Sequence, residues 1–388
     1  MRIVHVTDCY LPRLGGIELQ VHDLAQRQAA MGHDVTVLTT TAGDPSAGAG
    51  PVEVIRVTRR RAEAESIGYR ASFTAASGLV GDLGGFDLVH AHASCFSPLS
   101  FLATIQASER GVPTATTLHS LWARSSVYFA AAHHVFRWGR RPVAWSAVSN
   151  VAAGPLREIV SGRSPVTVLP NGVDPDRWTV AHQPGPASTL RIVAVARLAR
   201  RKRVRQLLEI LKVVDDRLPA GLSLDVNILG DGPERADIER YLRRHRMDQW
   251  VHLLGRRQRD EIREVFARSD LFVAPATLES FGIAALEARC AGLPVLALAG
   301  TGVEDFVANG REGWLVDSDA AMVNMISSLA RSRDVLEHVA RHNRSVPACI
   351  SWGRVLDSCE GLYQRAAEMQ GGHWRTPVPG PAAADRTG

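Results

Sequence analysis

The feature that most constrains this chain is an alternation of short apolar segments with helical patterns, which runs through the sequence twice. In the first half, the apolar segments predict strands over 3–7, 35–40, 54–57, 88–91, 114–118, 144–148 and 166–169. Helices are predicted over 17–31 and 98–109, and Gln28 falls on the same face of the first helix as Val21 and Leu24. Strands that alternate with helices in this way predict a parallel sheet covered on both faces.

The same alternation starts again after a turn-rich segment, 174–188, which we interpret as a linker. Here it predicts strands over 192–196, 224–229, 251–253, 271–274, 295–298 and 314–316. Helices are predicted over 203–217, 234–246, 259–267, 282–291 and 352–368. A length of 388 residues suits two such doubly wound α/β domains. Ligands bind at the carboxyl ends of the strands in such sheets, so two facing sheet edges would form a cleft.

Composition excludes several classes of function. The net charge of +5 is mild, and the arginine clusters at 59–61, 140–141 and 243–244 are short and lack interleaved aromatic residues, so we expect no nucleic-acid partner. The five cysteines are scattered and indicate neither a disulfide framework nor a zinc site. No apolar run approaches the ~18 residues of a membrane span. We therefore expect a cytoplasmic protein. Any contact with a membrane would be peripheral, through segments 59–73 and 122–145 on an anionic surface.

Two segments with small or basic residues follow predicted strands. Gly15 and Gly16 precede the first helix, where the backbone could approach an anion, although a plain tight turn is the commoner explanation of a Gly-Gly pair. Arg197 and Lys202 lie in the loop after the strand over 192–196. A guanidinium fork and an ammonium point charge both suit a diphosphate, and the alternative is a solvated basic loop.

The most specific segment runs from Glu279 to Glu287 and crosses the start of a predicted helix at Gly282. The amides of that helix N-terminus could hold phosphate, while Glu287 could bind two ribose hydroxyls and Glu279 the hydroxyls of a sugar. The alternative is an acidic pair that complements the helix dipole. His119 follows the strand over 114–118 and could face the cleft, but a lone histidine is more often structural.

Taken in order, these segments resemble a retaining glycosyltransferase of family 4 (GT4) with the GT-B fold, from residue 1 to about 365. Further motifs in register are the Asp-x-x-His-x-His strand at 87–92, Asn-Gly-Val-Asp at 171–174, the turn at 230–233, and Ser351-Trp352 followed by Tyr363. The resemblance implies an N-terminal acceptor-side domain over 1–173 and a nucleotide-sugar-binding domain over 189–350. It also implies a helix over 351–368 that crosses back to the first domain, and we expect the tail over 369–388 to be disordered.

The resemblance also implies residue roles. Gly16 and the amides of Phe281, Gly282 and Ile283 would contact the donor diphosphate and sugar, and Arg197 and Lys202 would neutralise the departing diphosphate. Glu287 would bind the ribose, Glu279 the donor sugar, and His119 the sugar near its reacting carbon. Arg256 would lie near the base, at a position that is usually apolar in the family. Ala196 and Arg203 stand where the family commonly has glycine.

Such enzymes transfer a sugar from a UDP- or GDP-linked donor to an acceptor hydroxyl with retention of configuration, and need neither a metal nor another cofactor. The acceptor is open at this stage: a glycan, a lipid or a small molecule. A sugar-nucleotide epimerase shares the same two-domain fold and is the alternative interpretation. Product release would distinguish the two, because an epimerase keeps the nucleoside diphosphate on the sugar.

Overall fold

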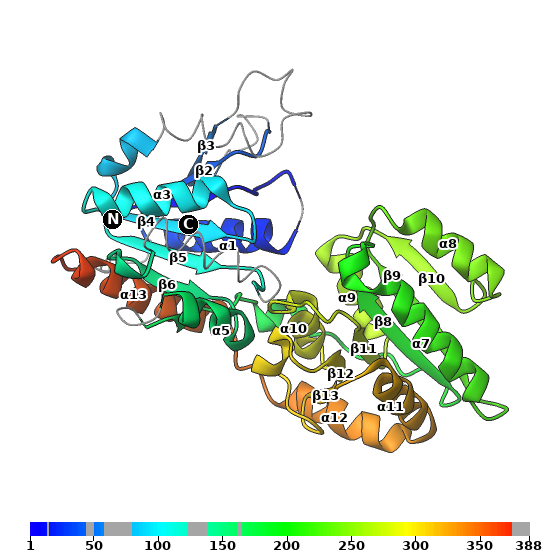
Figure 1. The fold of residues 1–388 in the computed structure, drawn as a ribbon. Coiled ribbons are helices and arrows are strands. Elements are labelled where there is room, and N and C mark those ends of the chain that lie inside the picture. Colours follow the sequence, from blue (N-terminus) through cyan, green and yellow to red (C-terminus); the bar gives the residue numbers. More distant parts are fainter. Residues whose placement is uncertain (14, 44–49, 58–79, 123–137, 161–164, 375–388) are drawn as a thin grey trace, which may run out of the picture. The chain divides into compact units, whose positions relative to one another are not determined.

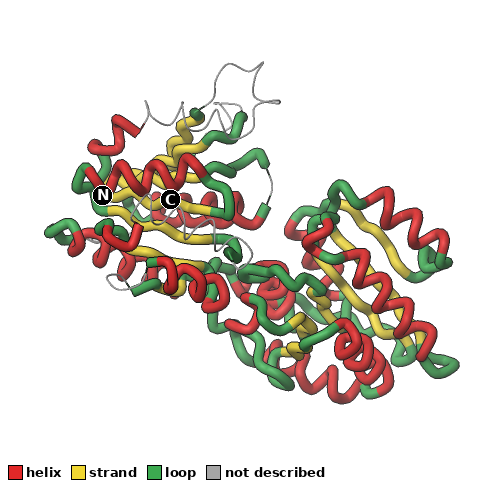
Figure 2. Tube along the Cα trace, viewed as in Figure 1, coloured by secondary structure: helices red, strands yellow, loops and turns green. Residues whose placement is uncertain are grey.

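The computed structural model describes residues 1–374 except 14, 44–49, 58–79, 123–137 and 161–164, and it divides into two compact units (Figure 1). Unit 1 comprises Met1–Gly172 and Trp352–Gly388, and unit 2 comprises Val173–Ser351. Each unit is built on an all-parallel sheet with helices packed against it, so strands and helices alternate along the trace (Figure 2).

The sheet of unit 1 has the strand order β3-β2-β1-β4-β5-β6-β7. Its strands are β1 (Arg2–Thr7), β2 (Asp34–Thr39), β3 (Val52–Arg56), β4 (Leu88–Ala93), β5 (Thr114–Leu118), β6 (Ala144–Ala147) and β7 (Thr167–Val168). Its helices are α1 (Gly16–Ala30), α3 (Pro98–Glu109), α5 (Asn150–Ile159) and α13 (Trp352–Met369), with 3-10 turns η2 (Val80–Gly85) and η3 (Trp138–Arg140). The strand order reverses between β1 and β4, which creates a topological switch point there.

The sheet of unit 2 has the order β10-β9-β8-β11-β12-β13. Its strands are β8 (Thr189–Val195), β9 (Ser223–Leu229), β10 (Val251–Gly255), β11 (Leu271–Ala274), β12 (Val295–Leu298) and β13 (Gly313–Val316). Its helices are α6 (Pro175–Trp178), α7 (Val204–Arg217), α8 (Arg235–Arg244), α9 (Arg259–Ala267), α10 (Ile283–Cys290), α11 (Asp319–Arg331) and α12 (Arg333–Ser345), with η4 (Arg200–Lys202) and η5 (Gly302–Asp305). The switch point of this sheet lies between β8 and β11.

The apolar spacing of α7 shows how these elements are held on their sheet. Five apolar residues recur at helical spacing, and the side chains of all five are fully buried: Val204, Leu207, Leu208, Leu211 and Val214. They pack into one core cluster with Ile192 of β8, Val226 of β9 and residues of α11. Burial of each large aliphatic side chain contributes roughly 1.5–3 kcal/mol. Packing of this face therefore stabilises α7 more than the intrinsic helix stability of its sequence does.

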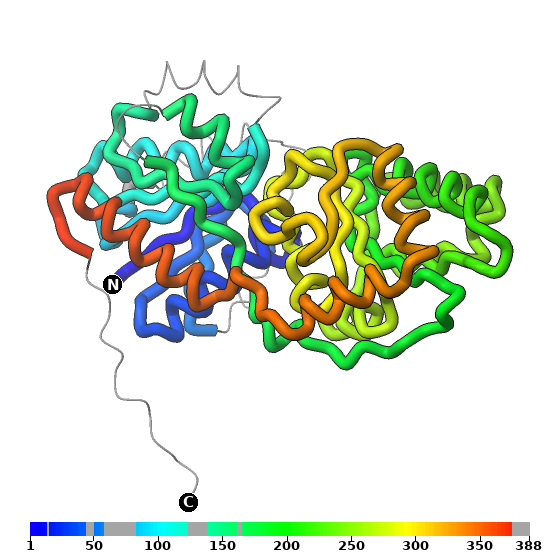
Figure 3. Tube along the Cα trace, turned by 90° about the horizontal axis from the view of Figure 1, so that it is seen from below, coloured from blue at the N-terminus to red at the C-terminus, as the bar shows by residue number. Residues whose placement is uncertain are grey.

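The C-terminal helix α13 returns to unit 1 and packs on β5 and β6, as Figure 3 shows in orange to red. Its first residue explains the Asn-Gly-Val-Asp motif: a Cβ added at Gly172 would lie 2.4 Å from the indole of Trp352. Gln20 of α1 fixes the same turn, because its amide accepts from Gly172 N–H at 2.9 Å and donates to Gly172 C=O at 3.0 Å. Glycine is therefore required here for close packing.

The predicted fold of two doubly wound parallel sheets with a helix that crosses back is confirmed. The apolar pattern did not predict α5, α11 or α12, and within the segment taken as a linker α6 forms and buries Trp178. The tail beyond 374, the segment 59–73 and most of 122–145 lie outside the described residues.

The tryptophans of segment 122–145 that the structure describes do not face solvent. Trp122, Trp138 and Trp145 are all buried, and Trp138 stacks on Phe101 with the ring centroids 5.0 Å apart. These three rings are packed inside unit 1, so they do not provide the aromatic contact with lipid that the composition of this segment suggested. Within the described part of the chain, no helix combines the length and the apolar character that crossing a bilayer requires.

Candidate active site

The switch point of unit 2 gathers most of the residues that the sequence singled out. β8 and β11 are neighbours in the sheet, so the loops that follow them leave the same edge. The first loop carries Arg197 and Lys202, and the second carries Glu279 and leads into α10. Lys202 and Glu279, whose hydrogen bond spans 77 positions in sequence, thus meet where parallel sheets bind ligands.

The basic loop after β8 is held by a glycine turn. Leu198 is fully buried, its N–H donates to Asp231 C=O at 3.0 Å, and its C=O accepts from Glu234 N–H at 3.0 Å. A Cβ at Gly230 would lie 2.0 Å from the Ala196 carbonyl oxygen, and one at Gly232 would lie 2.3 Å from that of Leu198. The turn at 230–233 therefore holds the backbone on both sides of Arg197, whose side chain is exposed.

Lys202 and Glu279 form an ion pair at this edge, with Lys202 Nζ 2.5 Å from Glu279 Oε2. Both side chains are only about one-fifth exposed, at 23% and 20%. The pairing was not anticipated from the sequence, which assigned the lysine to a diphosphate and the glutamate to a sugar. Each group holds the other in place and satisfies its charge.

Arg203 explains one departure from the family pattern. Its φ of 56° places it in the left-handed region, where glycine is favoured, and it stands where the family commonly has glycine. Its guanidinium donates to the Pro275 carbonyl oxygen at 3.0 Å and to Asp319 Oδ2 at 2.6 Å. These bonds tie the β8 loop to the β11 loop and to α11, and they offset the backbone cost.

The loop after β11 ends at the N-terminus of α10. Gly282 has a φ of 91°, and the first helical hydrogen bonds run from Ala285 and Leu286 N–H to Gly282 C=O. The amides of Gly282 and Ile283 therefore precede the hydrogen-bond ladder of the helix, as anion binding at a helix N-terminus requires. Phe281 is buried and anchors the turn, and Gly302 packs so closely that a Cβ there would lie 2.2 Å from the Ser280 carbonyl oxygen.

Glu287 and Arg256 complete the residues predicted in unit 2. Glu287 is half-buried on α10, one turn beyond Ile283. Arg256 is exposed directly after β10, and Gly255 C=O accepts from Gly230 N–H at 2.7 Å, which places this residue beside the turn at 230–233. Arg256 therefore lies at the sheet edge that carries the basic loop, and Glu287 lies on the helix that follows the β11 loop.

Gly16 and His119 belong to unit 1. Gly16 is the exposed first residue of α1, and Gly15 before it leaves room for the carboxylate of Glu18, which pairs with Arg13 at 3.1 Å. His119 follows β5, where its N–H donates to Ala93 C=O at 2.8 Å. Its ring is buried and lines a small cavity with Gln20, His92, Thr117, Asn171 and Trp352.

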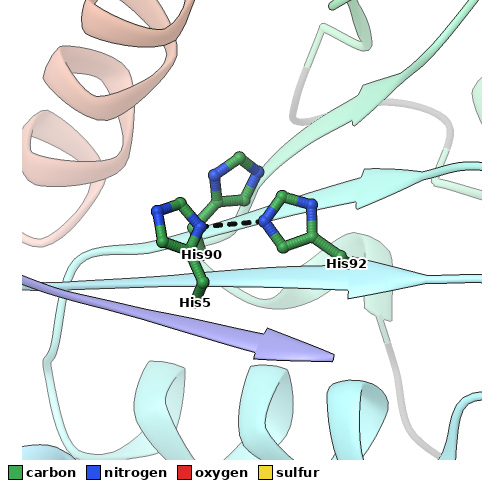
Figure 4. Close-up of side chains that lie close together, drawn as sticks. All are labelled: His5, His90 and His92. Carbon is green, nitrogen blue, oxygen red and sulfur yellow. Dashed lines mark hydrogen bonds between the residues drawn. The ribbon is translucent and has the colours of Figure 1, made fainter. Parts of the chain in front are cut away.

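His119 is one end of a buried cluster that the sequence did not reveal as a unit. His5 of β1 stands opposite His90 of β4 in the sheet register, and His92 lies two residues on, so the three rings gather on one face (Figure 4). His92 Nδ1 lies 3.1 Å from His119 Nε2. The signals were a polar residue within an apolar strand, His5, and Gln28 on an otherwise apolar helix face.

Burial keeps these histidines neutral. It lowers the pKa of His5 and of His119 from 6.5 to about 4, because a charged imidazole would lose its hydration. The pKa values of His90 and His92 lie well below the ordinary value for the same reason, with a further contribution from neighbouring histidines.

A metal ion is the other chemistry that three histidines can support. Nitrogen atoms of His5, His90 and His92 lie within 4.8 Å of one another. All the ring nitrogens of these residues already have hydrogen-bond partners, so a metal would have to displace several of those bonds. We therefore assign the cluster to a hydrogen-bonded network.

Comparison with known proteins places the chain in a family. Residues 14–177 match the model for Glycosyltransferase Family 4, and residues 180–346 match the model for Glycosyl transferases group 1. Glycogen synthase of Mycobacterium tuberculosis is 29% identical over 98% of this chain and 97% of its own length. The gpi3 subunit of phosphatidylinositol N-acetylglucosaminyltransferase from Schizosaccharomyces pombe is 25% identical, over 92% of this chain and 79% of its own.

Solved structures agree with this fold. HepE of Anabaena in complex with UDP-glucose superposes with a TM-score of 0.69 at 17% identity, covering 96% of this chain and 99% of that one. These matches favour sugar transfer over the epimerase alternative. The chain belongs to glycosyltransferase family 4 and is a retaining, nucleotide-sugar-dependent glycosyltransferase with the GT-B fold.

Proposed function

We propose that this chain moves a hexose from a UDP- or GDP-sugar to a hydroxyl of a glycan or glycolipid, with the donor held at the carboxyl edge of the unit 2 sheet. The observation that supports the proposal is that the loop with Arg197 and Lys202 and the loop that leads into α10 leave the same sheet edge, where Lys202 pairs with Glu279. Because HepE is described with UDP and with UDP-glucose, UDP-glucose is the first donor to test.

Charge at this edge suits departure of a diphosphate without a metal ion. As the bond from the anomeric carbon to the phosphate oxygen breaks, its electron pair stays on the diphosphate, which gains negative charge. The exposed Arg197 guanidinium and the Lys202 ammonium stabilise that charge, and the amides of Phe281, Gly282 and Ile283 add the helix N-terminus. No metal or other cofactor is required in this scheme.

In this proposal, the Lys202–Glu279 ion pair keeps both side chains at the donor site before the donor binds. Before the donor binds, each side chain is fixed by the other at 2.5 Å. With the donor bound, Lys202 turns toward the diphosphate and Glu279 accepts hydrogen bonds from sugar hydroxyls. The pair keeps both side chains ordered beside the donor site, so each needs only a local rotation when the donor binds.

Sugar transfer then proceeds on one face of the donor. The acceptor oxygen bonds to the anomeric carbon from the side that the diphosphate leaves, and its proton passes to the departing phosphate oxygen. Glu287 binds the ribose and Arg256 lies toward the base. The family resemblance extends the assignments to Gly16 and His119 of unit 1, as contacts of the diphosphate and the sugar.

The acceptor is proposed as a class. Relatives include a glycogen synthase and a transferase named for phosphatidylinositol, so a glycan and a glycolipid are both within the range of the family. A lipid acceptor would bring the chain to the inner face of an anionic membrane. Co-sedimentation with vesicles of anionic lipid at low salt tests this, and a chain that stays in the supernatant contradicts membrane contact.

The experiment for donor use is a panel of UDP-, GDP- and ADP-sugars with nucleoside diphosphate release as the readout. Lys202→Ala should lower kcat/KM about 100-fold or more, as loss of one preorganised charge contact does. Lys212→Ala is the matched control, because Lys212 is the other lysine of the chain and pairs with the exposed Asp216 on α7. Equal activity of the two variants would contradict the role given to Lys202.

Glu287→Ala tests the ribose assignment separately. Titration calorimetry should show weaker binding of the nucleoside diphosphate, whereas Glu264→Ala, which removes an exposed glutamate from α9, should leave binding unchanged. Unchanged affinity in Glu287→Ala would remove Glu287 from the proposed donor site.

A further inference from the structure

The histidine cluster of unit 1 is continuous with two side chains from helices that pack over it. Gln28 lies on α1 and Tyr363 on α13, and both are buried. Gln28 contacts His5 through one end of its amide and Tyr363 through the other. Two chains of hydrogen bonds therefore leave this one amide.

The first chain leads to His119. Gln28 Oε1 lies 2.6 Å from His5 Nε2, His5 Nδ1 lies 2.9 Å from His92 Nε2, and His92 Nδ1 lies 3.1 Å from His119 Nε2. Figure 4 shows the central link, between His5 and His92. His5 and His92 each use both ring nitrogens, so each passes the chain on to the next ring.

The second chain leads away from His119 and ends on the backbone. Gln28 Nε2–H donates to the Tyr363 hydroxyl at 2.9 Å, which lies 2.8 Å from His90 Nδ1. His90 Nε2 lies 2.7 Å from the Thr117 hydroxyl, and that hydroxyl lies 2.7 Å from Ser146 Oγ. The Ser146 hydroxyl in turn donates to the Thr116 carbonyl oxygen at 3.3 Å.

The Thr116 carbonyl at this end and the orientation of the Gln28 amide together set the direction of the bonds. A carbonyl oxygen only accepts, so the hydroxyls of Ser146 and Thr117 donate toward it, and His90 must donate from Nε2 to Thr117. A neutral His90 then accepts at Nδ1 from the Tyr363 hydroxyl. That hydroxyl accepts from the Gln28 amide, whose NH₂ group faces it.

The same reasoning continues along the first chain. With its NH₂ turned to Tyr363, Gln28 presents its oxygen to His5, which donates from Nε2 and accepts at Nδ1. His92 therefore donates from Nε2 to His5 and accepts at Nδ1 from His119. All four histidines carry their proton on Nε2, and turning the Gln28 amide over would move all four to Nδ1.

We propose that Gln28 and Tyr363 are positioning residues that set the tautomer of His119, through His5 and His92. His119 then holds its proton on Nε2, and its Nδ1 keeps a lone pair that accepts a hydrogen bond. Nothing in this assignment of the tautomer depends on the reaction. Its consequence for the reaction rests on the proposed function of the chain.

That consequence concerns charge near the sugar. Transfer by departure of a diphosphate develops positive charge on the sugar ring, so a cationic neighbour would oppose it. A neutral His119 that accepts from a sugar hydroxyl adds electron density instead. Burial, which lowers the pKa of the ring to about 4, supports the neutral form at physiological pH.

The test is the tautomer itself, read by ¹⁵N NMR of the full chain labelled with [¹⁵N₂]histidine at pH 7.5. Loss of one pair of signals in His119→Asn assigns the His119 ring. We expect a neutral ring with a protonated Nε2 and an unprotonated Nδ1. A ring protonated on Nδ1, or on both nitrogens, overturns the proposal.

The coupling of Tyr363 and Gln28 to the His119 tautomer is tested by removing one hydroxyl that lies far from His119. In Tyr363→Phe the ring is kept and three side chains separate the change from His119, yet the His119 signals should move toward a mixture of tautomers. Gln28→Met should do the same. Gln20→Met is the control, since Gln20 is also buried on α1 and loses two hydrogen bonds, both to Gly172, that belong to neither chain. An unchanged His119 tautomer in both test variants overturns the proposal.

Kinetics then separate this proposal from the proposed function. If the chain releases nucleoside diphosphate as proposed, Tyr363→Phe should lower kcat about tenfold and change the donor KM less than about threefold, because the loss falls on the transition state. If no donor is turned over while the NMR results hold, the proposed function fails and the tautomer assignment stands.

Discussion

Acidification is expected to destabilise unit 1 through its buried histidines. The ring of His5 has its pKa lowered from 6.5 to about 4, by burial first and by the nearby His33 to a smaller extent, while its bond with Gln28 acts the other way. Between these two pKa values, the unfolded chain binds a proton at His5 and the folded chain does not. Stability from this group is complete above pH 6.5 and is lost as the pH falls toward 4.

The magnitude follows from these two pKa values. Between pH 7.5 and 5.0, a group that shifts from 6.5 to about 4 removes about 2 kcal/mol from the free energy of unfolding. His119 has the same shift, so the pair removes about 4 kcal/mol, and His90 and His92 act in the same direction. A loss of this size is a large part of the stability of an ordinary domain.

Hydrogen exchange followed by mass spectrometry provides the assay, with rates corrected for the intrinsic effect of pH. Peptides from β1 and β4 report opening around the cluster, and peptides from β12 of unit 2 report effects that arise elsewhere. In His5→Gln the loss between pH 7.5 and 5.0 should be about 2 kcal/mol smaller than in the wild type. An equal loss in the two proteins, or a gain of stability on acidification, would refute the reasoning.

Three further substitutions test the packing that positions the site. Asp270→Asn should lower the free energy of unfolding, measured by denaturant titration, by about 3–5 kcal/mol. The reason is that the buried Asp270 carboxylate accepts from Arg191 at 2.7 Å and pairs with Arg333 at 2.8 Å. An unfolding free energy equal to wild type would contradict this. Gly172→Ala should reduce protection of α13 amides in hydrogen exchange, because its Cβ would meet the indole of Trp352; protection equal to wild type would contradict the close approach. Arg203→Gly should change the melting temperature little, since relief of the left-handed backbone offsets loss of the Asp319 ion pair; a large fall would mean that the pair dominates.

Much of the fold could be predicted because its signals are local. Apolar segments and helical spacing predicted two parallel sheets, and glycines such as Gly230 and Gly282 marked turns that the structure needs. The resemblance supplied the order of the motifs along the chain. α5, α11 and α12 were missed, although each buries an apolar face at helical spacing.

The details of the site could not be predicted in the same way. The Lys202–Glu279 pair joins residues 77 positions apart, and only the adjacency of β8 and β11 brings them together. The histidine network depends on the register of β1 against β4 and on α13 returning to unit 1, so the two signals, His5 and Gln28, could not be connected from the sequence alone. Side-chain chemistry of this kind is decided by tertiary contacts.

The central claim is that the chain transfers a sugar with retention while a nucleoside diphosphate leaves, and that no metal takes part. Proton NMR of the wild-type chain with UDP-glucose, in the presence of EDTA, tests it most directly through the first sugar product. We predict release of UDP and a product that keeps the α configuration of the donor. A first product of β configuration, a sugar that changes while still linked to UDP, or activity that EDTA abolishes would contradict the account.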